Sequence, residues 1–187
     1  MTIDESFATI SDRMIGGIMF HIQLSNYFNF LGLKGYAECH KYHYYDENKH
    51  YVDLCDYYIN HYNKLIAEKK IENKGIIPDD WYMFTRFNVD SNIRKTSIKT
   101  GIDQWVKWER ETKAMLEQQY QNLINLNAIA MAKKVEEIIK DVDEELAHAE
   151  KKLLFLKAVD YNISDIMNEQ EEVYKHFHKK IKEIELL

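Results

Sequence analysis

Hydrophobic residues recur at helical spacing along most of the chain. In the first segment, from about residue 4 to residue 31, Phe7, Ile10, Met14 and Ile18 follow one another at intervals of three or four residues. This spacing places the side chains on one face of an α-helix. The chain contains one proline, Pro78, and six glycines, and so few helix breakers favour long helices. The pattern therefore predicts an all-α protein.

The same pattern divides the chain into five helices. We expect them at about residues 4–31, 36–72, 101–126, 129–159 and from residue 164 onward. Gly32 and Gly35 bound the first turn, and Asn127 lies in the turn between the third and fourth helices. Residues 73–99 are then a long crossover, in which Pro78 is placed to begin a short helical turn.

Two tight hairpins joined by a long crossover predict a four-helix bundle in up-down-down-up order. The crossover can run the length of such a bundle, because extended chain covers about 3.3 Å per residue. No internal repeat or low-complexity linker marks a second domain. We therefore expect residues 1–187 to form one bundle domain. The sequence leaves open whether the fifth helix packs across the bundle or lines the pore of an assembly.

Composition excludes several classes of function. Lys and Arg total 25 against 31 Asp and Glu, which gives a formal charge of −6. This balance argues against a large nucleic-acid interface, and an acidic surface would instead attract cations. No run reaches the roughly 20 apolar residues of a membrane span, and the acidic start of the chain is not a signal peptide. Cys39 and Cys55 fall on one helix, about 24 Å apart at 1.5 Å per residue. They cannot pair with each other, so we expect a reducing, cytoplasmic setting.

The candidate chemistry lies in two motifs of identical spacing. Glu47 precedes His50 by three residues, and Glu145 precedes His148 by three residues. Residues three apart share a helix face, so each pair can converge on one metal ion. A single Glu-x-x-His is a common surface pattern on helices of this composition. Both copies, however, flank the apolar stripe of their helix, where a carboxylate is costly unless it is paired or bound to metal.

Counting from the turns places further residues at the same level. Partners in an antiparallel hairpin lie side by side when they are equidistant from the turn. By this rule Glu109 faces Glu145, because their midpoint is residue 127, and His21 faces Glu47, because their midpoint is residue 34. His21 can equally be a hydrogen-bonded core histidine, and Glu109 a solvated residue of an amphipathic helix. The set His21, Glu47, His50, Glu109, Glu145 and His148 nevertheless forms a candidate group of metal ligands.

Neighbouring polar residues have two interpretations. His40 and His43 lie on the same side of the second helix as Glu47, and Asp141 lies one turn before Glu145. They can support metal ligands through hydrogen bonds, or they can be packing neighbours and part of a charged face. Seven tyrosines between residues 42 and 62 are more typical of packing at an interface than of redox chemistry.

At this point the sequence resembles the ferritin-like superfamily. Residues 46–50 (DENKH) resemble the second-helix metal motif of ferritins, and residues 108–112 (WERET) resemble the segment around their third-helix glutamate. Residues 143–149 (DEELAHA) resemble the fourth-helix motif of bacterioferritins and rubrerythrins. The resemblance spans about residues 10 to 156 and is one of pattern rather than close identity. The short first turn, followed by Tyr36 and His40, is similar to the Dps branch.

The resemblance implies a di-iron site that oxidises Fe(II), a ferroxidase activity, with storage or detoxification of iron in a homo-oligomer. Manganese and zinc accept the same ligands. One departure bears on activity: the family has a glutamate on the first helix, and the level-matched residue here is His21. This departure supports an alternative, a structural or interaction protein with an altered metal site. A Dps-like protective role is the third reading, and the acidic balance of the chain counts against it.

Overall fold

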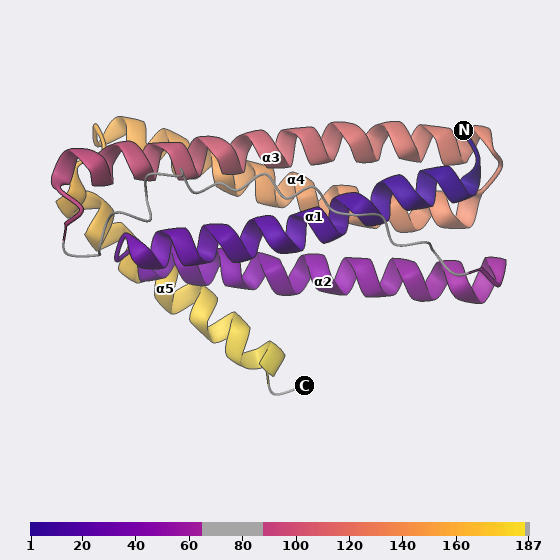
Figure 1. Cartoon of the computed structure of the whole chain (residues 1–187), viewed down its shortest axis with the longest axis horizontal. Coiled ribbons are helices and arrows are strands. Elements are labelled where there is room, and N and C mark those ends of the chain that lie inside the picture. The colour runs from indigo at the N-terminus through magenta and orange to yellow at the C-terminus, as the bar shows by residue number, and fades with distance from the viewer. Residues whose placement is uncertain (65–87, 186–187) are drawn as a thin grey trace.

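The computed structural model describes residues 1–64 and 88–185, and these residues form five helices and no strand. The helices, shown in Figure 1, are α1 (Ile3–Phe30), α2 (Lys34–Tyr62), α3 (Ser91–Asn125), α4 (Ile129–Ala158) and α5 (Ile163–Glu185). The predicted all-α fold is confirmed, and α1, α4 and α5 begin close to the expected positions. Among the described residues, no helix is long and apolar enough to cross a membrane.

Two predicted boundaries are wrong. Helix α3 begins at Ser91 rather than at residue 101, because Asp90 caps it by accepting hydrogen bonds from two backbone N–H groups of the first turn, both at 2.8 Å. Gly101 lies inside this helix and allows close packing, since a Cβ there would lie 2.7 Å from the ring of Phe28. Helix α2 ends at Tyr62, because Asn63 adopts the left-handed conformation with φ of 50°. The rest of the predicted helix, from residue 65, and the turn at Pro78 lie outside the described residues.

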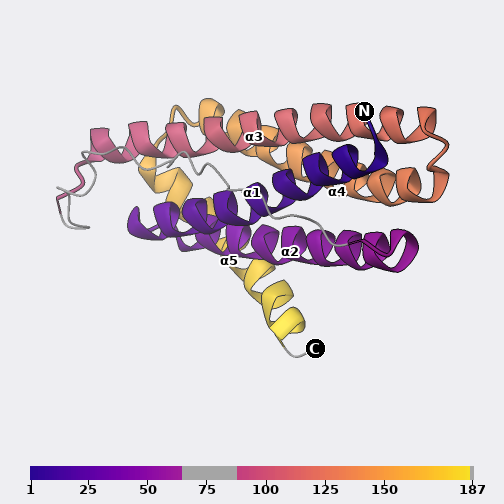
Figure 2. The same cartoon turned by 45° about the vertical axis from the view of Figure 1, so that its right-hand side comes forward.

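The helices form two antiparallel hairpins. Helix α1 packs along α2, and α3 packs along α4, as Figures 1 and 2 show from two directions. Helix α2 ends at one end of the bundle and α3 begins at the other, so these two helices run parallel. This is the predicted up-down-down-up order. Gly32 makes the first turn possible, because its φ of 82° is readily accessible only to glycine.

Helix α5 leaves the bundle axis and crosses α2 at an angle (Figures 1 and 2). The two helices approach closely at Gly35, whose backbone N–H donates a 2.7 Å hydrogen bond to the side-chain carbonyl of Gln170. A Cβ on Gly35 would lie only 1.9 Å from the backbone oxygen of Gln170. The fifth helix therefore packs across the bundle, which answers one question that the sequence left open.

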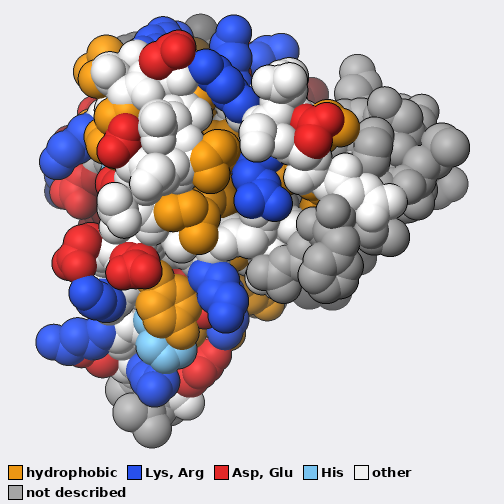
Figure 3. All heavy atoms as spheres, turned by 90° about the vertical axis from the view of Figure 1, so that its left-hand side faces the viewer, with side chains coloured by type: hydrophobic (Ala, Val, Ile, Leu, Met, Phe, Trp, Pro, Cys, Tyr) orange, Lys and Arg blue, Asp and Glu red, His pale blue; other side chains and the backbone are white. Residues whose placement is uncertain are grey.

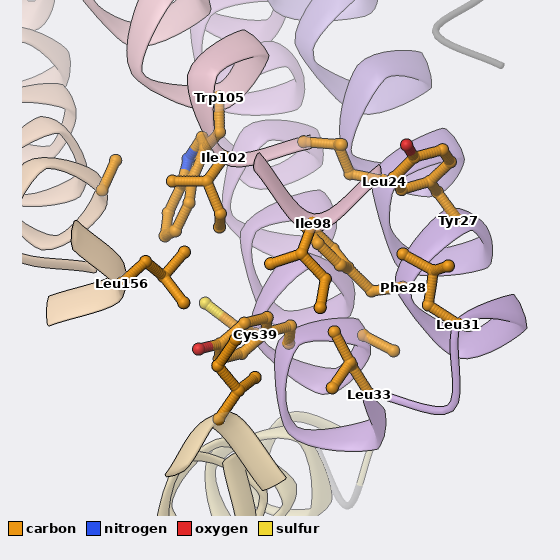
Figure 4. Packing of buried hydrophobic residues seen from close by; sticks show 14 of the residues in the cluster. Leu24, Tyr27, Phe28, Leu31, Leu33, Cys39, Ile98, Ile102, Trp105 and Leu156 are labelled. Carbon is orange, nitrogen blue, oxygen red and sulfur yellow. The ribbon is translucent and has the colours of Figure 1, made fainter. Parts of the chain in front are cut away.

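The bundle has two apolar clusters along its length. The α5-side cluster is shown in Figure 4 and includes Leu24, Phe28, Ile98, Ile102 and Leu156. The distal cluster fills the other end and includes Ile10, Met14, Leu116, Leu123 and Val135. On α2, α3 and α4, the buried residues between these two clusters include polar ones, and on α1 the buried His21 follows Phe20 at the inner edge of the α5-side cluster. This polar level of the core positions the candidate site.

Candidate metal centre

Each of the four long helices contributes at least one buried ionisable residue to the polar level, and four of these residues come from four different helices. These residues are His21 on α1, Glu47 on α2, Glu109 on α3 and Glu145 on α4. His21 and Glu109 are fully buried, and Glu47 and Glu145 are 2% and 7% exposed. Four separate helices thus bring three carboxylates and one imidazole into the middle of the bundle, where charged groups are rarely found without partners.

We call His21, Glu47, Glu109 and Glu145 the carboxylate group. Within it, His21, Glu109 and Glu145 have donor atoms close to one another. The Nε2 atom of His21 lies 3.4 Å from Oε1 of Glu109 and 3.9 Å from Oε2 of Glu145. One donor atom from each of the three residues lies within 4.8 Å of the others. Metal–ligand bonds of about 2 Å would require only a small contraction of this group. Glu109 also faces Glu145, as the spacing from the second turn predicts.

The carboxylate group is short of hydrogen bonds. Both carboxylate oxygens of Glu109, one of Glu47 and one of Glu145, and Nε2 of His21, are buried without a hydrogen-bond partner among the described residues. Burial raises the pKa of Glu47 well above its ordinary value, and the nearby carboxylates of Glu145 and Glu109 raise it further. Burial also raises the pKa of Glu145 well above its ordinary value, and the nearby carboxylate of Glu109 raises it further. Because unpaired buried groups are costly, this donor set suits a cation.

Arg13 is a basic residue that acts electrostatically on Glu47, and its side chain is held against α3. Arg13 donates hydrogen bonds to Oγ1 of Thr112 at 2.7 Å and to the backbone oxygen of Trp108 at 2.8 Å. Its guanidinium also lies 3.5 Å from the centroid of the Trp108 ring. Arg13 attracts Glu47, which slightly opposes the rise in the pKa of that carboxyl. It makes no ion pair with any member of the carboxylate group among the described residues.

The predicted alignment of α1 with α2 is shifted by about one helical turn. The turn is centred near residue 32, between the end of α1 and the start of α2, and not at residue 34. His21 therefore lies against His40 and His43, with ring centroids 5.3 and 5.4 Å away. Gly17 lies against Glu47 instead, and a Cβ at Gly17 would be 2.7 Å from Oε1 of that glutamate. The residue of α1 that faces Glu47 thus has no side chain.

His40 orients His21. The Nδ1 atoms of these two residues lie 3.1 Å apart, so one ring donates a hydrogen bond to the other. His40 is fully buried and stacks on Phe28, with ring planes 9° apart. Burial lowers the pKa of His40 well below its ordinary value, and the neighbouring histidines lower it further. A neutral ring held in this way fixes the ring of His21, whose Nε2 then faces the carboxylates.

A second set of donors lies beside the first. Cys39, His43 and His148 each offer one donor atom within 4.8 Å of the other two, and we call them the thiol–imidazole group. His43 connects the two groups, because its Nδ1 lies 2.9 Å from Oε1 of Glu145. His148 therefore groups with Cys39 and His43 and not with its motif partner Glu145. The sequence alone indicates only that Cys39 is a free thiol, although its spacing of four residues from His43 places both on one face of α2.

His50 and Asp141 lie apart from both groups. Nε2 of His50 is 2.8 Å from Oδ2 of Asp141, on the more exposed side of the bundle. The structure thus gathers His21, Glu109 and Glu145, places Glu47 beside them, assigns His148 to the thiol–imidazole group, and leaves His50 paired with Asp141.

A cleft of about 880 Å³ leads to this region from the surface. Residues of α2, α4 and α5 line it, and they include Glu145, His43 and His148. Acidic residues such as Asp46 and Glu144 also line the cleft. Members of both donor groups are therefore reachable by a small ion from solvent.

Comparisons with known proteins identify the fold. No protein-family model matches the sequence, and no curated protein matches it. Among solved structures, the chain is similar to an Archaeoglobus fulgidus ferritin engineered into a closed form, with a TM-score of 0.74 and 14% identity over 93% of this chain and 96% of that one. It is also similar to the open-pore ferritin of the same archaeon, with a TM-score of 0.73 and 14% identity over 91% of this chain and 94% of that one. A third similar structure is a humanized archaeal ferritin, with a TM-score of 0.74 and 14% identity over 93% of this chain and 97% of that one. The chain therefore has the ferritin-like fold, as its sequence pattern predicts.

Proposed function

We propose that this protein binds Fe(II) at the carboxylate group, oxidises it with O₂ or peroxide, and stores or detoxifies the product in a homo-oligomeric shell. The observation that carries this proposal is the burial of three carboxylates and His21 with unpaired donor atoms at the middle of the bundle. The ferritins of like fold lend it support.

The donors suit both oxidation states of iron. Imidazole binds Fe(II) well, and carboxylates favour the harder Fe(III) product. Each Fe(II) gives one electron to the oxidant, and the additional positive charge is balanced by Glu47, Glu109 and Glu145. Loss of a proton from Glu47 or Glu145 on iron binding would supply the negative charge that their raised pKa values otherwise suppress.

The test is iron loading of the metal-free protein. Apoprotein is titrated with Fe(II) without oxygen, and oxygen is then admitted while absorbance of the ferric product is followed. We expect stoichiometric binding and rapid oxidation, both lost in a Glu47→Gln, Glu145→Gln double variant. Glu111→Gln is the matched control, because Glu111 is an exposed residue of α3, two positions from Glu109. Oxidation at an unchanged rate in the double variant would refute the proposal.

A second candidate is a structural or interaction protein that has the fold without redox activity. Gly17 favours it, because the face of α1 opposite Glu47 carries no carboxylate. Elemental analysis of protein purified without added metal separates the two. Absence of iron, manganese and zinc, with a melting temperature that metal addition does not change, would support this second function.

A DNA-protecting function has less support. Figure 3 shows acidic and basic side chains interspersed on the end of the bundle that faces the viewer, rather than a continuous basic surface. The formal charge of −6 also opposes binding to phosphates. A gel shift of DNA by this protein that weakens as the salt concentration rises would support a DNA-protecting function.

A further inference from the structure

Helix α2 carries a buried thiol that belongs to the α5-side cluster and lies close to His43 and His148. Cys39 is 2% exposed and has no disulfide partner. Figure 4 shows its sulfur close to Leu156, among the side chains of the α5-side cluster. Free cysteines are often buried for packing alone, so a site requires other donors nearby.

Two imidazoles supply those donors. One nitrogen of His43 and one of His148 lie within 4.8 Å of the Cys39 sulfur and of each other. Ligand atoms around a tetrahedral zinc ion are roughly 3.5 Å apart, given bonds of about 2.0–2.3 Å. The donor atoms must therefore move about 1 Å closer together to bind one ion. All three residues lie on just two helices, α2 and α4, so side-chain rotations can make this change while the helices stay in place.

His43 indicates that the group is incomplete without a further partner. It is 4% exposed, and its Nε2 is buried without a hydrogen-bond partner among the described residues. Its Nδ1 lies 2.9 Å from Oε1 of Glu145 and is likewise buried without a hydrogen-bond partner among the described residues. A core histidine retained only for packing would be expected to satisfy both ring nitrogens. The lack of a hydrogen-bond partner at His43 is thus a second observation, besides the proximity of the three donor atoms, that supports a bound metal ion.

The chemistry of the donors distinguishes this group from the carboxylate group. A thiolate with two imidazoles is a softer set than carboxylates and selects zinc, Co(II) or copper(I) over calcium or magnesium. Three protein ligands with an open fourth position form an accessible metal site rather than a closed structural one. His43 and His148 line the cleft, which provides the entry path.

We infer that Cys39, His43 and His148 bind a borderline divalent cation such as Zn²⁺, in a site separate from the proposed iron site. As the metal–sulfur bond forms, the Cys39 thiol loses its proton to solvent. The fourth position stays open to water from the cleft. This inference does not depend on iron oxidation, although contact between His43 and Glu145 would couple occupancy of the two sites.

Co²⁺ is the probe, because a thiolate ligand gives it a near-ultraviolet charge-transfer band that carboxylate and imidazole ligands do not give. Reduced, metal-free full-length protein is titrated with Co²⁺ under anaerobic conditions. We expect the thiolate band to saturate at one ion per chain and to disappear when Zn²⁺ is added. Failure of the wild-type protein to develop this band would overturn the inference without need of any variant.

Three variants sharpen the result. Cys39→Ser should remove the band and weaken Zn²⁺ binding by on the order of 100-fold. Cys55→Ser should retain both, because Cys55 lies on the same helix outside the group. Glu109→Gln should also retain the band, so that loss of the iron site and loss of this site are distinguishable. A band that persists in Cys39→Ser, or that disappears in Cys55→Ser, would contradict the assignment.

Discussion

The distal cluster and the polar level of the core differ in what their residues do. The distal cluster consists of hydrophobic side chains from all four long helices, with Met14, Leu116 and Val135 fully buried. Next to it, the same helices place Glu47, Glu109 and other ionisable residues in an equally buried layer. One region is packed to be stable, and the other holds donor atoms without partners. The difference indicates that the polar layer is retained at a cost in stability, and a bound cation would offset that cost.

The largest effect that does not depend on pH is expected in the distal cluster. Leu116→Ala should lower the free energy of unfolding by about 3 kcal/mol, because it removes a fully buried side chain and leaves a cavity. Metal binding should be unchanged. Leu154→Ala is the control, since Leu154 is 67% exposed. Chemical denaturation measures the first effect and metal titration the second, and a loss of metal affinity in Leu116→Ala would show that the two regions are not independent.

A change at the α2–α5 contact should rank next. Gly35→Ala places a methyl group 1.9 Å from a backbone oxygen of α5, which cannot move as a side-chain end can. We expect destabilisation of about 2 kcal/mol and faster proteolysis of α5. Exposed Lys34, changed to Ala, is the control. If Gly35→Ala leaves both stability and proteolysis unchanged, α5 is not fixed to α2 at this point.

Glu47→Gln should raise the free energy of unfolding of the metal-free protein, whereas the two preceding substitutions lower it. The pKa of Glu47 is raised in the folded state, mainly by burial. The stability that this group contributes is therefore complete below its ordinary pKa of 4.5 and is lost as pH rises toward the folded value. The variant should be more stable than wild type above that pH, by an amount that grows by up to about 1.4 kcal/mol per pH unit.

The measurement is thermal unfolding of both proteins in chelator between pH 5 and pH 8, and then with metal. Metal should stabilise the wild type and leave Glu47→Gln almost unchanged. Equal stability of the two metal-free proteins at every pH would indicate that the buried carboxyl carries no cost. Glu111→Gln, at an exposed position, should follow the wild type throughout.

Gly17→Ala should change stability least and still affect binding. Alanine favours a helix over glycine by up to about 1 kcal/mol, whereas its methyl group would lie 2.7 Å from Oε1 of Glu47. The carboxylate must move, so the net change in stability should be under about 1 kcal/mol while metal affinity falls. The adjacent Gly16→Ala is a matched control, because its Cβ would meet Trp108 and not Glu47. Equal metal affinity in both variants would argue against Glu47 as a ligand.

Helices and their order follow from local rules, and these parts of the fold were predictable from the sequence. Hydrophobic spacing locates α1 and α4, and turn residues locate the hairpins. The start of α3 was missed because Gly101 was interpreted as a boundary, whereas it lies inside the helix to admit Phe28. A glycine required for close packing and a glycine that ends a helix cannot be distinguished without knowledge of the neighbouring helix.

The candidate site was partly predictable for a similar reason. Counting from the second turn correctly pairs Glu109 with Glu145, because that turn is centred at residue 127. The same count from the first turn fails by about one helical turn, and it pairs His21 with Glu47 instead of with His40. The thiol–imidazole group was missed because its three donors come from two helices whose relative rotation the sequence does not specify.

The central claim is that the carboxylate group binds iron. The most direct test is a crystal structure of protein loaded anaerobically with Fe(II), with an anomalous difference map collected at the iron absorption edge. We expect a peak between His21, Glu109 and Glu145, within bonding distance of Glu47 after a small side-chain shift. Iron found only at the surface, with the buried carboxylates arranged as in the metal-free protein, would contradict the account.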